Sequence, residues 1–253
     1  MIPDYFIFVP AYNVAATLAG VLGRIPPAVM ERAQVLVIDD GSKDDTRGAY
    51  ETFVGAAPNT KNAAHLEYMR FEFNRGYGAV VKCGISEGLR SGAKYIACLH
   101  GDGQYPAEQL GEFFEHLETA DISSAGNSPA IALVQGSRRL VPGAARAGNM
   151  PLHKRIGGAF LTALENIAFR QKLTDRHSGF IVYNAEFLKT LDLAKLSPSF
   201  DIDLEIISIA DARGWRLAEL PIPTRYAGEK SNLNVVTYGL RVLRQIARRI
   251  CMR

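Results

Sequence analysis

The stretch AKYIACLHGDGQYP, residues 93–106, gives the clearest indication of the fold. Its first seven residues form a mostly apolar run, which predicts a short buried strand. The strand leads into a loop in which Asp102 stands between two glycines, and glycines let a ligand approach the backbone closely. Pro106 suits the first turn of a helix. The stretch therefore predicts a strand that delivers a carboxylate to a cleft and is followed by a helix.

The same order of strand and helix recurs on the N-terminal side of this stretch. The apolar runs are residues 5–9, 33–39, 65–71 and 94–100, and the helical segments after them are about 14–23, 44–56, 78–92 and 106–118. Strands that alternate with helices of about 10–15 residues are typical of βαβ units and a parallel sheet. Such sheets bind ligands beyond the carboxyl ends of their strands. We therefore expect four polar or glycine-rich strand ends to meet in one cleft, namely residues 10–13, 39–42, 74–78 and 100–104.

The rest of the chain is less regular. We expect strands or extended segments over 132–139, 177–184 and 215–223, helices near 151–170 and over 203–213, and a surface connection over 121–133. The whole pattern predicts an α/β fold, a mostly parallel sheet flanked by helices, in a single domain over residues 1–230. Residues 231–253 form a basic amphipathic C-terminal helix in this interpretation.

Composition and charge restrict the class of protein. With 47% apolar and 22% charged residues the chain is an ordinary soluble globular protein, and its formal charge of +3 is too small to indicate nucleic acid. The three cysteines are far apart and have no metal-ligand spacing. No stretch approaches the roughly 20 apolar residues of a membrane-spanning helix, and the N-terminus lacks the basic region of a signal peptide. We expect a cytoplasmic protein that is soluble or associates peripherally with a membrane.

Asp102 is the best candidate for a metal ligand. Mg²⁺ is often held by one or two carboxylates together with phosphate oxygens of the substrate, so a single carboxylate can suffice. Alternate residues of an extended chain point the same way, so His100, Asp102 and Gln104 can share a face. An imidazole ligand from His100 would favour Mn²⁺ over Mg²⁺. For a histidine in this position, packing beside the site or hydrogen bonding to a ligand is a more common role than binding the metal.

The acids at the second strand end have two interpretations. One acid of VIDDGSKDDT, residues 37–46, can accept hydrogen bonds from a nucleobase. Asp44, Asp45 and Ser42 are also suitable caps for the following helix. The glycines of 74–78 do not form the spacing of a dinucleotide-binding or P-loop sequence, which disfavours both of those classes.

With these segments in order, the chain resembles the family 2 glycosyltransferases of the GT-A fold, in particular the dolichyl- or polyprenyl-phosphate mannosyl- and glucosyltransferases. The resemblance is carried by VPAYN (9–13), VIDDGSKDDT (37–46), NRGYGAVVKCGI (74–85), GDGQYP (101–106), GSRR (136–139), SGF (178–180), ELPIP (219–223) and RYAGEKSNLN (225–234). It implies inverting transfer of a hexose from a nucleotide diphosphosugar, of the GDP-mannose or UDP-glucose type, to a polyprenyl phosphate. It also implies a divalent cation, Mg²⁺ or Mn²⁺.

The resemblance also implies roles for particular residues. Asp40 would meet the base, and Asp102, Arg138 and Asp175 would take part in the transfer, with Asp175 as a base or as a group that orients the acceptor. The donor site would comprise Pro10, Tyr12, Asn13, Asp39, Asp40, Gly101, Asp102, Arg225 and Lys230. The metal ligands would be Asp102, Gln104 and His100, and the acceptor phosphate would meet Arg138, Lys154 and Arg155. These cations have a direct rationale, because both substrates are anionic and arginine binds phosphate oxygens in pairs.

Four positions depart from the family pattern. Val14 stands where the family commonly has Glu, and His100 replaces the first Asp of an Asp-x-Asp pair, which predicts weaker metal binding. Lys230 precedes Ser231, the reverse of the family's order, and the connection 121–133 is longer than usual.

The basic C-terminal helix has two interpretations. A basic amphipathic helix is typical of binding to a membrane surface, which a lipid acceptor requires. The same helix can instead pack on the domain, in which case a membrane partner subunit would position the enzyme.

Three other functions can be compared with the sequence. The acceptor can be a sugar hydroxyl in polysaccharide or glycolipid synthesis, although the cations of GSRR and of Lys154 and Arg155 disfavour it. A nucleotidylyltransferase would open with a glycine-rich loop and a basic residue, which VPAYNVAATL lacks. A non-catalytic nucleotide-sugar-binding module is compatible with Val14 and His100.

Overall fold

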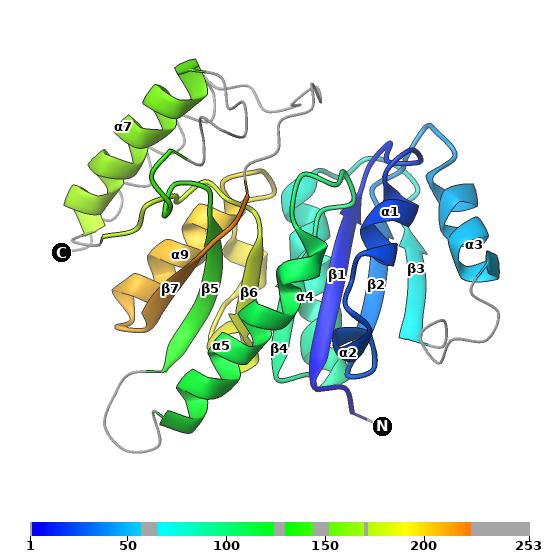
Figure 1. Ribbon diagram of the computed structural model, residues 1–253, viewed down its shortest axis with the longest axis horizontal. Coiled ribbons are helices and arrows are strands. Elements are labelled where there is room, and N and C mark those ends of the chain that lie inside the picture. The colour runs from blue at the N-terminus through cyan, green and yellow to red at the C-terminus, as the bar shows by residue number, and fades with distance from the viewer. Residues whose placement is uncertain (1, 57–64, 124–129, 144–151, 170–171, 224–253) are drawn as a thin grey trace.

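The computed structural model describes residues 2–56, 65–123, 130–143, 152–169 and 172–223 (Figure 1). In this part of the chain one sheet has the strand order β3-β2-β1-β4-β6-β5-β7. The strands are β1 (Tyr5–Ala11), β2 (Ala33–Asp39), β3 (Leu66–Arg70), β4 (Tyr95–Cys98), β5 (Ile131–Ser137), β6 (Ile181–Asn184) and β7 (Arg216–Pro221). The helices are α1 (Leu18–Gly23), α2 (Pro27–Met30), α3 (Thr46–Ala56), α4 (Tyr77–Ser91), α5 (Leu110–Ser123), α7 (Leu152–Phe169), α8 (Ala185–Leu188) and α9 (Ile202–Ala212).

The sheet is mostly parallel, which confirms the predicted fold class. β1 pairs in parallel with β2 and β4, β2 with β3, and β5 with β7. β6 is antiparallel to both of its neighbours, β4 and β5. Because β6 runs against the other strands, the loop before it lies at the edge where they end.

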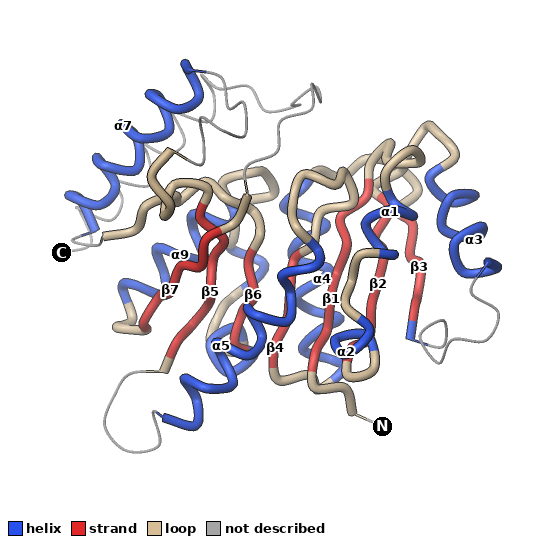
Figure 2. Tube along the Cα trace, viewed as in Figure 1, coloured by secondary structure: helices blue, strands red, loops and turns tan. Residues whose placement is uncertain are grey.

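Helices cover both faces of the sheet (Figures 1 and 2). Successive side chains of a strand point to opposite faces, so Tyr5 and Ile7 of β1 pack with α1, α2 and α5, whereas Phe6 and Phe8 pack with α4, α8 and α9. α4 lies close to β1 because Gly84 carries no side chain: a Cβ there would come within 2.3 Å of the Phe8 ring. The apolar runs of the sequence thus form two cores, one on each face.

Three boundaries differ from the sequence-based expectation. α1 begins at Leu18 and not near Val14, because residues 14–17 form a turn and the Val14 N–H donates to the Thr46 hydroxyl. α5 continues to Ser123, so the predicted connection starts later than residue 121. β6 begins at Ile181, and residues 177–180 belong to the loop before it.

Several expectations fall outside the described residues. These are Arg225, Lys230, the boundary at residue 230 and the basic helix over 231–253. Lys154 lies in α7, but its side chain is also outside the description. In the ranges that are described, no helix is long and apolar enough to cross a membrane.

Candidate functional site

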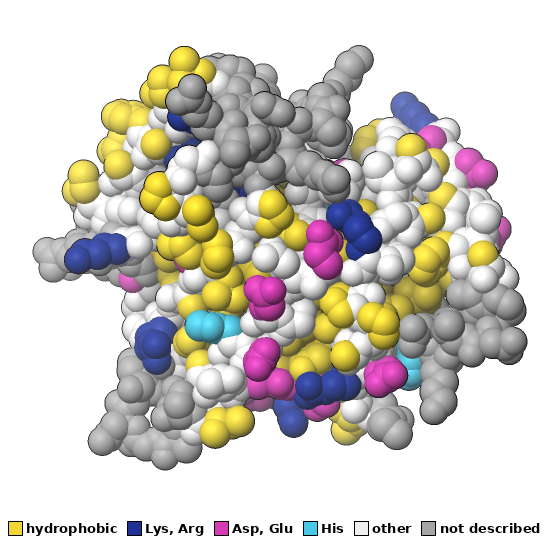
Figure 3. Space-filling model, in the orientation of Figure 1, with side chains coloured by type: hydrophobic (Ala, Val, Ile, Leu, Met, Phe, Trp, Pro, Cys, Tyr) yellow, Lys and Arg dark blue, Asp and Glu magenta, His cyan; other side chains and the backbone are white. Residues whose placement is uncertain are grey.

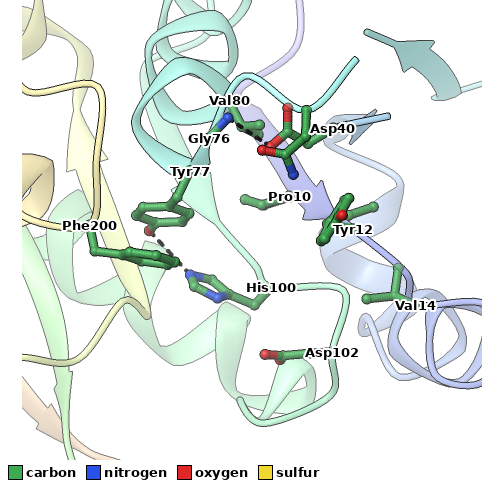
Figure 4. A pocket seen from close by; sticks show the side chains of 12 residues that line it. Pro10, Tyr12, Val14, Asp40, Gly76, Tyr77, Val80, His100, Asp102 and Phe200 are labelled. Carbon is green, nitrogen blue, oxygen red and sulfur yellow. Dashed lines mark hydrogen bonds between the residues drawn. The ribbon is translucent and has the colours of Figure 1, made fainter. Parts of the chain in front are cut away.

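A pocket of about 440 Å³ lies beyond the carboxyl ends of β1, β2 and β4 (Figure 4). It gathers residues from all four strand ends that the sequence predicts to converge. The pocket is lined by Pro10, Ala11, Tyr12, Val14, Asp40, Asn74, Gly76, Tyr77, Val80, His100, Asp102 and Phe200. Pro10, Tyr12, Asp40, His100 and Asp102 are therefore brought together as the sequence analysis expects.

Asp40 is held at the N-terminus of α4. Its two carboxylate oxygens accept hydrogen bonds from the backbone N–H groups of Arg75, at 2.6 Å, and Gly76, at 3.0 Å. Burial raises the pKa of Asp40, and the two N–H groups act in the opposite direction. Each carboxylate oxygen can accept more than one hydrogen bond, so Asp40 is oriented by the backbone and can still accept from a ligand in the pocket.

Asp39 and Asn13 build the wall of the site and do not line the pocket. Asp39 is fully buried, and it accepts hydrogen bonds from the Ser42 N–H at 2.8 Å and the Tyr68 hydroxyl at 2.5 Å. Asn13 has a left-handed backbone, with φ 55°, and its side-chain oxygen accepts from the Lys43 N–H at 2.7 Å. Asn13 thus ties the loop after β1 to the loop after β2, whereas Asp39 ties its own loop to β3. Neither residue lines the pocket, so their predicted contact with the donor stays a prediction.

The glycine-rich loop after β4 presents Asp102. The Gly101 N–H donates to the carbonyl of Pro10 at 3.0 Å, and the Thr17 hydroxyl donates to the carbonyl of Gly101 at 2.7 Å. One oxygen of Asp102 accepts from the backbone N–H of Gln104 at 3.1 Å. Gln104 thus meets Asp102 through its backbone, and its side chain is not among those that line the pocket.

His100 lies between Tyr77 and Asp102 (Figure 4). Its Nε2 is 3.2 Å from the Tyr77 hydroxyl oxygen, and that hydroxyl donates to Oδ2 of Asp203 at 2.9 Å. Burial lowers the pKa of His100, although the charge of Asp102 acts to raise it. Burial raises the pKa of Asp203 to about 7.

The residues suitable for a cation are few. Among the described residues, no three His, Cys, Asp or Glu side chains gather as metal ligands. In the same part of the chain the second oxygen of Asp102 and Nδ1 of His100 have no hydrogen-bond partner, and both residues line the pocket. This donor set fits a divalent cation whose other ligands are substrate phosphates and water.

Arg138 and Asp175 form a two-point ion pair outside the pocket lining. The Arg138 Nε and Nη2 atoms donate to the two carboxylate oxygens of Asp175 at 2.7 and 3.0 Å, and Nη2 also donates to the carbonyl of His177 at 3.1 Å. Burial acts to raise the pKa of Asp175, but Arg138 outweighs it and the pKa is lowered. A carboxylate in this state is a weak base, so the geometry favours the orienting role for Asp175 over the role of a base.

A second buried cluster joins α7 to the loop that carries Asp175. Glu165 of α7 is fully buried, and its Oε2 lies 3.3 Å from Nε2 of His177. Burial raises the pKa of Glu165 to about 7, partly offset by Arg176, and burial lowers the pKa of His177 to about 4. Both groups are therefore mainly neutral just below pH 7.

Replacement of Glu165 by Gln is expected to change how stability depends on pH. Between the unfolded pKa of about 4.5 and the folded pKa of about 7, only the folded protein keeps the proton, so stability falls as pH rises through this window. The unfolding free energy of the variant minus that of the wild type should therefore be about 2 kcal/mol higher at about pH 8.5 than at about pH 5.5. Urea denaturation at both pH values measures this difference. An equal difference at both would contradict a proton held on Glu165.

Comparisons with known proteins place the chain in a family. Residues 6–192 match the sequence model of Glycosyl transferase family 2, and the chain belongs to this family. It is a glycosyltransferase, as the resemblance in its sequence implies.

Two curated relatives are similar over most of the chain. Undecaprenyl-phosphate mannosyltransferase of Micrococcus luteus is 29% identical over 85% of this chain and 80% of its own length. Dolichyl-phosphate beta-glucosyltransferase ALG5C of Trichomonas vaginalis is 28% identical over 87% of this chain and 64% of its own length. Among solved structures, glucosyl-3-phosphoglycerate synthase from Mycobacterium tuberculosis, in complex with Mn²⁺, UDP and product, has a TM-score of 0.65. It is 15% identical, over 98% of this chain and 80% of that one. This likeness confirms the GT-A-like fold.

The sequence analysis missed three residues that shape the pocket. Tyr77 and Phe200 stack with ring centroids 5.3 Å apart, and Asp203 lies behind Tyr77. The available signals were weak: Tyr77 follows a glycine at a helix entry, and Asp203 is an acid within the apolar helix α9.

Proposed function

We propose that the chain transfers a hexose, with inversion, from a nucleotide diphosphosugar to a polyprenyl phosphate, and that the reaction requires a divalent cation. The observation that carries this proposal is the pocket itself, which joins Asp40, Asp102 and His100 at the strand ends of a family 2 glycosyltransferase. The names of the two curated relatives support a lipid phosphate as acceptor, and they differ in the sugar, mannose or glucose.

The donor's nucleoside lies against Pro10 and Tyr12 in this proposal. Asp40 accepts a hydrogen bond from an N–H of the base, because the N–H groups of Arg75 and Gly76 fix the direction of its carboxylate. Val14 lines the same pocket and offers no charge to the donor. Arg225 and Lys230 lie outside the described ranges, and their contact with the diphosphate stays a prediction.

Asp102 and His100 would hold the divalent cation, Mg²⁺ or Mn²⁺, beside the donor's phosphates. When bound, the cation neutralises charge on the departing nucleoside diphosphate. Gln104 contributes through its backbone N–H, which fixes one oxygen of Asp102 and leaves the other toward the pocket.

The transfer itself needs little proton movement. An oxygen of the acceptor phosphate forms a bond to the anomeric carbon while the bond from that carbon to the donor's β-phosphate oxygen breaks. The attacking oxygen is already ionised near neutral pH, so a strong general base is not required. Arg138, held by Asp175, and Arg155 of α7 receive the acceptor phosphate, and Lys154 adds a further charge in this proposal.

α7 supports a lipid acceptor. Leu152, Ile156, Phe160 and Ile167 follow helical spacing and are 62%, 62%, 64% and 79% exposed; we call them the apolar face of α7. Apolar side chains gather along this outer edge in Figure 3. The buried side of the same helix contacts His177 through Glu165, and the His177 carbonyl accepts from Arg138. In this proposal the lipid chain lies on the apolar face of α7 at a membrane surface, and its phosphate reaches Arg138 on the inner side of the helix.

The direct test is transfer of radiolabelled sugar to a polyprenyl phosphate. GDP-mannose and UDP-glucose are the donors, each with Mg²⁺, with Mn²⁺ or with a chelator. Cation-dependent formation of a labelled lipid establishes the proposal and names the sugar. Transfer only to a sugar hydroxyl, or donor hydrolysis without a lipid product, would move the acceptor to another class.

Replacement of both Phe160 and Ile167 by Glu is expected to weaken binding to polyprenyl phosphate in liposomes. Burial of one such side chain stabilises by roughly 1.5–3 kcal/mol, so the loss should be at least about 10-fold. Co-sedimentation measures it, and KM for a short water-soluble prenyl phosphate should change little. The matched control is Ile122→Glu, because Ile122 is 78% exposed at the end of α5. Equal binding of the double variant and the control would contradict a role of α7.

A further inference from the structure

The ring of His100 is connected to a buried acid through a single tyrosine. The Tyr77 hydroxyl donates its proton to Oδ2 of Asp203, at 2.9 Å. Its oxygen lies 3.8 Å from the Cys98 Sγ and 3.2 Å from Nε2 of His100, and a hydroxyl that donates to Asp203 can accept from that nitrogen. In a neutral imidazole one nitrogen carries the proton and the other carries the lone pair. The arrangement therefore places the proton on Nε2 and leaves the lone pair on Nδ1.

Packing fixes the ring in this orientation. Tyr105 meets the ring edge-on with centroids 5.0 Å apart, and a Cβ at Gly179 would come within 2.7 Å of Nε2. Asp203 is itself held, because the Tyr183 hydroxyl donates to its other oxygen at 3.3 Å. The residues that fix His100, directly or through Tyr77, come from α4, α9, the loop after β4 and the loop before β6, so no single segment determines the position of the ring.

The free nitrogen faces the site of the cation. Nδ1 of His100 has no hydrogen-bond partner among the described residues, and Figure 4 shows Asp102 on the opposite side of the ring from Tyr77. A nitrogen ligand suits Mn²⁺ better than Mg²⁺, whereas a carboxylate suits both. Groups that hydrogen-bond to the second nitrogen of a ligand imidazole set its tautomer and orientation.

We propose that Tyr77 and Asp203 are positioning residues that hold His100 with its Nδ1 lone pair toward the cation, and so make this site select Mn²⁺ over Mg²⁺. The inference rests on the proposed donor site and deepens it. It does not depend on the identity of the acceptor, because cation binding can be measured without one.

The test is the affinity for Mn²⁺ and for Mg²⁺ in the presence of UDP, measured by calorimetry on the full chain. The wild type should prefer Mn²⁺. Tyr77→Phe removes the hydroxyl that fixes the tautomer, and it should weaken Mn²⁺ binding by about 10-fold or more with a smaller change for Mg²⁺. His100→Asp restores a carboxylate and should shift the preference toward Mg²⁺.

Tyr105→Phe is the matched control. Tyr105 packs on the same ring but makes its hydrogen bond with the Gly179 N–H, so this variant should keep the ratio of the two affinities. Circular dichroism checks that each variant is folded. If the ratio of Mn²⁺ affinity to Mg²⁺ affinity is the same in Tyr77→Phe, Tyr105→Phe and the wild type, the inference is wrong.

NMR of ¹⁵N-labelled histidine provides a second readout, which a purely structural role of Tyr77 would not move. In the cation-free wild type, His100 should show a protonated Nε2 and an unprotonated Nδ1. Asp203→Asn can donate as well as accept, so both tautomers should appear in that variant. A proton on Nδ1 in the wild type would overturn the inference. If the protein selects Mn²⁺ but transfers no sugar to a lipid, only the proposed acceptor is wrong. If it binds no cation in the presence of UDP, both this inference and the proposed cation-dependent function are wrong.

Discussion

Replacement of Asp102 by Ala is expected to reduce cation-dependent transfer by roughly 100-fold or more. Asp102 is the one carboxylate that the loop after β4 presents at this pocket, and a backbone N–H already orients it. Without it the cation would keep a single protein ligand, His100, and charge on the departing diphosphate would be poorly neutralised. Initial rates at several Mn²⁺ concentrations measure the effect, which should appear in both the apparent cation affinity and kcat.

Glu108→Ala is a suitable control for this variant. Glu108 lies in the short 3₁₀ helix Ala107–Gln109, just after the same loop, and its side chain is 56% exposed beside Arg24. The substitution removes the same charge from the same region without touching the pocket. An Asp102→Ala enzyme with the rate and the cation dependence of Glu108→Ala would refute the assignment of Asp102 as a ligand.

Replacement of Asp175 by Ala is expected to lower the free energy of unfolding by roughly 3–5 kcal/mol. The side chains of Asp175 and Arg138 are 1% and 17% exposed, so removal of the acid leaves a largely buried guanidinium without its two-point partner. Arg138→Met should also destabilise, and the double variant should lose less than the sum of the two single variants. Urea denaturation of the four proteins measures this coupling.

A surface ion pair gives the comparison. Lys195 and Asp192 lie 2.8 Å apart with side chains 84% and 54% exposed, and exposed pairs contribute little to stability because water screens them. Asp192→Ala should therefore be nearly neutral. If Asp175→Ala is equally mild but inactive, Asp175 acts on the substrate, and the role of a base would have to be reconsidered.

The sequence predicted which strand ends converge, because chain direction alone determines it. Pro10, Asp40 and Asp102 follow parallel strands, and parallel strands end at one edge, so their convergence needed no knowledge of side-chain packing. Asp39 shows where this reasoning stops. Adjacent residues at a strand end point in opposite directions, so Asp40 enters the pocket while Asp39 turns to Tyr68.

Other features depend on contacts between distant parts of the chain. Tyr77 and Asp203 are separated by 126 positions, and only the packing of α4 against α9 shows that they form a hydrogen bond. The apolar spacing of α7 was visible in the sequence, but apolar helical spacing normally marks a buried face. The structure exposes that face, because the side that carries Glu165 and Thr162 is the one that packs on the domain.

The reversed direction of β6 has a consequence for how substitutions act on the two sides of the site. In the proposed site the donor contacts loops that follow strands, whereas Asp175 and Gly179 lie in the loop that precedes β6. This loop contacts the donor side through noncovalent interactions, such as the 2.8 Å hydrogen bond from the Gly179 N–H to the Tyr105 hydroxyl. Because a Cβ at Gly179 would come within 2.7 Å of Nε2 of His100, the two surfaces are tightly coupled at this one point. A change of the acceptor side elsewhere in the loop before β6 can leave the donor side intact, whereas a change at Gly179 would disturb both.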